Sequence, residues 1–105
     1  MEAPEERFAA LLGARSEALV AEELVLRARA DLNAERPREA ALQARVALEA
    51  LVAERPELGV AEHRDAVGRA ANAALASELG GPELEALTEA IEAMEAAVRR
   101  VRLGG

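Results

Sequence analysis

The chain of 105 residues contains no cysteine, lysine, tryptophan or tyrosine, and its one aromatic residue is Phe8. The absence of cysteine excludes a disulfide framework and a thiolate nucleophile. The absence of lysine and tyrosine excludes a Schiff-base amine and a phenolic acid. A serine-based triad would need His63, the single histidine, but on one continuous helix Ser77 would lie about 21 Å away along the axis. The composition therefore favours a protein that is not an enzyme.

Long apolar runs and a positive net charge are also missing. No uninterrupted apolar stretch approaches the roughly 20 residues that a membrane-spanning helix needs. The formal net charge is −7, which opposes binding to phosphate backbones and to anionic lipid surfaces. The acidic start of the sequence is unlike the positive region of a secretion signal. We therefore expect a cytoplasmic protein that binds neither nucleic acid nor membranes.

The residues that are abundant form helices well. Hydrophobic residues make up 51% of the chain and charged residues 31%, and alanine, leucine, glutamate and arginine, all strong helix formers, dominate. Both GC-biased codon usage and de novo design are consistent with this lysine-free, alanine-rich composition. With almost no aromatic residues, the core has to be filled by small aliphatic side chains. Such a core lets helices approach closely or leaves a gap between them.

Proline and glycine residues divide the chain into helical segments. Pro37, Pro56 with Gly59, and Gly80-Gly81-Pro82 are typical of helix starts and stops. Short connections make successive helices antiparallel neighbours. The sequence thus predicts one domain, residues 1–105, that is all-α: an up-down antiparallel bundle of about four helices preceded by a short N-terminal helical segment. The predicted segments, of which the first two form either one helix or two, are 4–13, 16–34, 37–55, 60–79 and 82–102.

The last predicted helix has a single apolar face, as in an ordinary packing helix. The residues that fall on this face at helical spacing are Leu84, Leu87, Ile91, Met94, Val98 and Val101. Met94 is interpreted as core filler rather than as a metal or haem ligand. Three arginines lie near the end of this helix, where their positive charges interact favourably with the negative end of the helix dipole: Arg99, Arg100 and Arg102.

Two other helices each carry a second apolar stripe, which a simple bundle does not require. In segment 16–34 this stripe contains Leu19 and Leu26, and in segment 37–55 it contains Leu42 and Val46. A second stripe implies a further neighbour, and a symmetric dimer is the commonest way to bury one. The leading hypothesis is therefore a non-catalytic bundle that works without a cofactor, through self-association or by docking a partner helix.

His63 carries the alternative hypothesis of a haem- or small-molecule-binding bundle. At helical spacing it shares the apolar face of segment 60–79 with small residues, and Gly68 within that segment indicates close approach of a backbone or ligand. A single imidazole among small side chains could be an axial haem ligand or a pocket contact. No second metal ligand lies on its turn, so His63 is a metal ligand only if haem is bound. The pocket residues of this hypothesis are His63, Val67, Gly68, Ala70 and Ala74.

Overall fold

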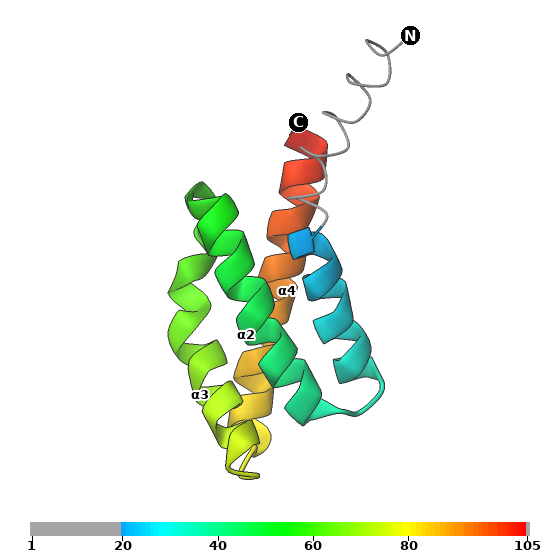
Figure 1. The fold of residues 1–105 in the computed structure, drawn as a ribbon, viewed down its shortest axis with the longest axis vertical. Coiled ribbons are helices and arrows are strands. Elements are labelled where there is room, and N and C mark those ends of the chain that lie inside the picture. Colours follow the sequence, from blue (N-terminus) through cyan, green and yellow to red (C-terminus); the bar gives the residue numbers. More distant parts are fainter. Residues whose placement is uncertain (1–19, 105) are drawn as a thin grey trace, which may run out of the picture.

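A computed structural model of the chain describes residues 20–104, of which 88% are helical and none form a strand. The described residues form four helices, which lie side by side (Figure 1). The first helix covers 20–33 of the described residues, and α2, α3 and α4 are Pro37–Glu54, Arg64–Leu75 and Gly81–Gly104. Two 3₁₀ helices, η1 (Pro56–Leu58) and η2 (Val60–His63), connect α2 to α3. The predicted all-α bundle is confirmed, whereas the predicted segment 4–13 lies outside the described residues.

Two helices end in Schellman motifs that lack the usual glycine. Glu35, after the first helix, and Ser77, after α3, both have φ = 60°, in the left-handed region. After α3 the N–H of Ser77 donates to the carbonyl of Ala74 at 3.1 Å, and the N–H of Glu78 donates to Ala73 at 2.7 Å. These bonds satisfy carbonyls that the end of a helix leaves without partners. Because the motif turns the chain sharply, each helix is followed by an antiparallel neighbour.

The segment expected as one helix over 60–79 is shorter and interrupted. Its first residues form η2, and the α-helix begins only at Arg64 and ends at Leu75. The first turn is tightened into a 3₁₀ helix, in which the N–H of Arg64 donates to the carbonyl of Ala61 three residues earlier. His63 is consequently the residue before α3, with φ and ψ of −90° and 4°, rather than a position on a regular helical face.

Helix α4 is twice as long as α3. It contains 24 residues against 12, so at 1.5 Å per residue it extends about 18 Å further. It begins where the N–H of Gly80 donates to the Glu83 carboxylate at 3.0 Å, half of a capping box. Its last turns therefore lie beyond α3, near the first described residues of the first helix (Figure 1). No helix in residues 20–104 is long and apolar enough to cross a membrane.

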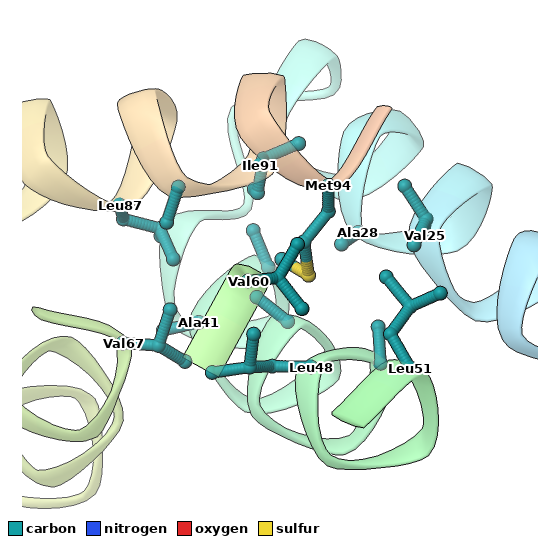
Figure 2. Packing of buried hydrophobic residues seen from close by; sticks show 14 of the residues in the cluster. Val25, Ala28, Ala41, Leu48, Leu51, Val60, Val67, Leu87, Ile91 and Met94 are labelled. Carbon is teal, nitrogen blue, oxygen red and sulfur yellow. The ribbon is translucent and has the colours of Figure 1, made fainter. Parts of the chain in front are cut away.

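The core consists mainly of alanine. Eleven of the nineteen buried hydrophobic residues are alanines, so the helix axes can approach closely. Figure 2 shows the larger side chains that fill the space between them. Each of the four helices and η2 contributes at least one of these larger buried residues: Val25, Leu48, Leu51, Val60, Val67, Leu87, Ile91 and Met94.

Arginine side chains join the helices in pairs of hydrogen bonds. Arg29 of the first helix donates from Nε and from a terminal nitrogen to Glu95 of α4, both at 2.9 Å. Arg64 donates in the same way to Glu49 of α2, at 2.8 and 2.9 Å. A planar guanidinium can make both bonds at once, and a lysine ammonium cannot. The lysine-free composition is thus compatible with a bundle whose helices are oriented by paired bonds.

Candidate association groove

An apolar groove opens at one end of the bundle, where the first helix, the end of α2 and the end of α4 meet. It combines two adjoining hollows that share Glu22 and Val98. We call it the end groove. The apolar side chains that line it are Ala21, Val25, Leu26, Leu51, Val98 and Val101.

The lengths of α3 and α4 explain why the described residues leave this end partly uncovered. The last turns of α4 extend beyond α3, where Val98 and Val101 line a hollow together with residues of the first helix and of the end of α2. Both valines are half-buried, whereas Ile91, two turns earlier on α4, is fully buried. Leu51 of α2 is buried beneath the groove. The apolar face of α4 thus continues past the point where the described residues can cover it.

Charged side chains of both signs surround the apolar floor. Three carboxylates, those of Glu22, Glu54 and Glu95, and three guanidinium groups, those of Arg55, Arg99 and Arg102, line it. Glu22 forms an ion pair with Arg102, and the Glu22 side chain is 13% exposed. An apolar centre with a mixed polar rim is the usual arrangement of a protein–protein contact.

The Arg29–Glu95 pair holds one wall of the groove in place. Its two hydrogen bonds raise the pKa of Arg29, against the opposing effect of burial. Both side chains are about a quarter exposed, so the pair is screened less than a pair on the open surface. Because it links the first helix to α4, it fixes the distance between the two helices that form the groove.

The dimensions of the groove suit side chains rather than a large cofactor. Its two hollows have volumes of about 50 and 120 Å³. Pockets for organic ligands usually measure about 300–1,000 Å³. The end groove can therefore accept a few apolar side chains from a helix laid along it, which is a known mode of recognition.

The structure separates the residues predicted to form one association surface. Leu26 is 56% exposed and lines the end groove. Val46, 54% exposed, and half-buried Leu42 lie on the side of α2 that faces away from its buried alanines. Leu19 lies outside the described residues. Leu26 therefore shares a surface with α4 and not with the outer stripe of α2.

The residues of the haem hypothesis are likewise in different environments. Val67, Ala70 and Ala74 are fully buried in the core, while the side chain of His63 is 28% exposed and lies 4.0 Å from a Glu62 carboxylate oxygen. A Cβ added at Gly68 would meet no atom within 4 Å, so close packing does not explain this glycine. None of these five residues lines the end groove. Haem binding stays the untested alternative hypothesis.

Sequence reasoning placed Val98 and Val101 in the core and missed their role at the end groove. Length gave no signal, because the predicted last helix, 82–102, is only one or two residues longer than the other predicted long helices; the difference appears only in the structure, where α3 has 12 residues and α4 has 24. The contribution of Leu51 could not be predicted either, because nothing in its helical pattern distinguishes a residue at the end of the bundle from one in the middle.

Neither a metal site nor a similar protein gives a further clue to the function. Among residues 20–104 there is no group of three or more histidine, aspartate or glutamate side chains arranged to hold a metal ion. Comparisons of the chain with protein-family models, with curated proteins and with solved structures gave no significant match.

Proposed function

We propose that this chain is a non-catalytic association protein that docks an amphipathic helix in the end groove. The observation that supports the proposal is the pair of adjoining apolar hollows on the first helix, α2 and α4, which are lined by half-buried Val98 and Val101 and by exposed Leu26. Burying apolar surface stabilises a complex by about 25 cal/mol per Å² before the costs of association. The charges of both signs at the rim favour a helix that carries positive and negative side chains beside its apolar face.

The docked helix comes either from a second copy of the chain or from a partner protein. A second copy presents the same rim, with three carboxylates and three guanidinium groups. Such a rim is self-complementary when two copies are related by a twofold axis. Self-association is therefore the form of the proposal to test first.

Two neighbouring positions on α4 provide a matched pair of variants. Val101 faces the groove, whereas Leu103 is 87% exposed and lies about 200° further round the helix. We expect the weight-average mass from sedimentation equilibrium to rise with concentration for the wild type and for Leu103→Glu, but not for Val101→Glu. Circular dichroism establishes that each variant is folded.

Other results would change the proposal in distinct ways. Equal association of both variants would place the contact elsewhere, and a further loss in Val46→Glu would assign it to the outer stripe of α2. A constant monomer mass in all samples would contradict self-association. In that case only docking of a helix from another protein would be retained, to be tested with the same pair of variants.

A further inference from the structure

An exposed leucine lies beside the larger of the two hollows in the end groove. Leu26 of the first helix is 56% exposed and lines this hollow together with Val98 of α4. The ion pair between Glu22 and Arg102 sets the antiparallel register of these two helices. In that register Leu26, four positions after Glu22, lies level with Val98, four positions before Arg102. The leucine and the hollow are therefore at the same height on one face of the bundle.

Two copies of the chain can use this leucine and this hollow at the same time. A twofold axis parallel to the helices leaves the height of every residue unchanged, so the first helix of one copy meets α4 of the other in the same antiparallel register. We propose that the chain forms such a dimer, in which Leu26 of each copy enters the larger hollow of the other. This inference rests on the proposed helix-docking function and names the helix that docks.

The hollow has about the size of one leucine side chain. Its volume is about 120 Å³. By comparison, truncation of a single leucine in a packed core can leave a cavity of about 150 Å³. Val25 and Val98 give the hollow apolar walls, so the entry of a leucine removes apolar surface of both copies from water.

The charges on the two helices change sign at the level of Leu26 and Val98. On one side of this level the first helix is acidic and α4 is basic, through Glu22, Glu23, Arg99 and Arg102. On the other side the first helix is basic and α4 is acidic, through Arg27, Arg29, Glu92 and Glu95. The first helix of a second copy, docked in the same register, therefore meets α4 with opposite charges on both sides of the leucine.

The outer charges of this set are available to a second copy. Glu23 and Arg27 pair only with each other among the described residues, and their side chains are about 60% exposed. Within residues 20–104, Glu92 and Arg99 are exposed and form neither a hydrogen bond nor an ion pair. A second copy can thus pair with them without breaking the bonds that join the first helix to α4 within one copy.

A twofold axis perpendicular to the helices fits these charges poorly. With Leu26 at the hollow, it would make the first helix of the second copy parallel to α4. The acidic residues before Leu26 would then lie level with Glu95, and the basic residues after it level with Arg102, so like charges would meet. The axis parallel to the helices instead makes the two first helices and the two α4 helices antiparallel to their neighbours, as in an up-down four-helix bundle.

Disulfide formation between single-cysteine variants tests the orientation of the two copies. The sequence has no cysteine, so in an equal mixture of Leu26→Cys and Val98→Cys each chain carries one thiol. Mild oxidation should give mainly the mixed dimer, because position 26 of one copy meets position 98 of the other. Intact mass distinguishes this dimer from both homodimers, since leucine and valine differ by one methylene group. A mixture of Leu26→Cys with Val46→Cys, on the outer side of α2, is the control and should give little dimer.

Two results of this experiment would overturn the inference. A homodimer of Leu26→Cys as the main product would bring the two leucine positions together, which requires the perpendicular axis. Equal yields of mixed dimer with Val98→Cys and with Val46→Cys would show that the hollow is not the contact.

Sedimentation equilibrium of two complementary variants tests the leucine and the hollow themselves. Leu26→Ala removes the side chain that enters, and Val98→Phe fills the hollow. We expect the dissociation constant of each variant alone to rise at least about tenfold above that of the wild type. Association should return in an equal mixture, because the leucine of Val98→Phe can enter the open hollow of Leu26→Ala while the alanine faces the filled hollow. Circular dichroism establishes that each variant is folded.

The outcomes separate this inference from the proposed function. If the wild type associates and Leu26→Ala associates equally well, the inference is overturned and docking in the end groove is retained. Because Leu26 is exposed, this comparison holds even if Val98→Phe does not fold. If both folded variants lose association and their mixture does not recover it, the inference is also overturned. A wild type that is monomeric at every concentration would contradict the self-associating function and this inference together.

Discussion

Ser77→Gly is expected to stabilise the protein, because Ser77 holds a left-handed conformation at the end of α3. Its φ of 60° costs an L-residue about 1–2 kcal/mol, and this cost vanishes for glycine. Glycine loses about 0.5–1 kcal/mol of that advantage because its unfolded chain is more flexible. The net gain is about 0.5–1 kcal/mol. For a domain of this size, this corresponds to a rise in Tm of about 2–8 °C.

Thermal unfolding followed by circular dichroism measures this shift, and Ser77→Ala is the matched control. Alanine also removes the hydroxyl but keeps the Cβ that makes the left-handed conformation costly. We therefore expect its Tm to stay close to the wild-type value. Glu35, with the same φ after the first helix, offers an independent repeat through Glu35→Gly. The two gains should add because the sites lie in separate turns.

The reasoning would be refuted if Ser77→Gly had the same Tm as Ser77→Ala, or a lower one. Either result would mean that the left-handed turn at Ser77 carries no strain that glycine relieves.

Three further predictions concern side chains at the helix interfaces. Arg29→Lys should lower the free energy of unfolding by about 0.5–1 kcal/mol in urea titrations, because lysine cannot keep both bonds to Glu95; a variant as stable as the wild type would contradict this. Hydrogen bonds from Arg64 lower the pKa of Glu49, so their contribution to stability is complete above the ordinary pKa and is lost as the pH falls through the folded value. An NMR titration should show the pKa of Glu49 rising in Arg64→Gln, and no rise would reject the assignment. Hemin should give no Soret band that depends on His63, since its neighbours on α3 are packed in the core; stoichiometric binding abolished by His63→Ala would favour the haem alternative.

The helical class and the order of the helices could be predicted because they depend on local signals. Pro37 at the start of α2 and Gly80 before α4 lie where the sequence placed helix boundaries. The apolar spacing of α4 identified Leu87, Ile91 and Met94, which are buried. The ends of α3 were not predictable in this way. Ser77 stops the helix although serine usually avoids the left-handed region, and η2 replaces its expected first turn.

The end groove was decided by the tertiary structure. The sequence determined that Val98 and Val101 share the apolar face of α4, but their coverage depends on how far α2, α3 and the first helix reach along it. That reach follows from η2 and Ser77, which limit α3 to twelve residues, and from the pairing of Arg29 with Glu95. The helical periodicity of the sequence indicates which face of a helix is apolar. Which part of that face stays open is set by the lengths and relative positions of the other helices, and contacts between residues far apart in the chain determine these.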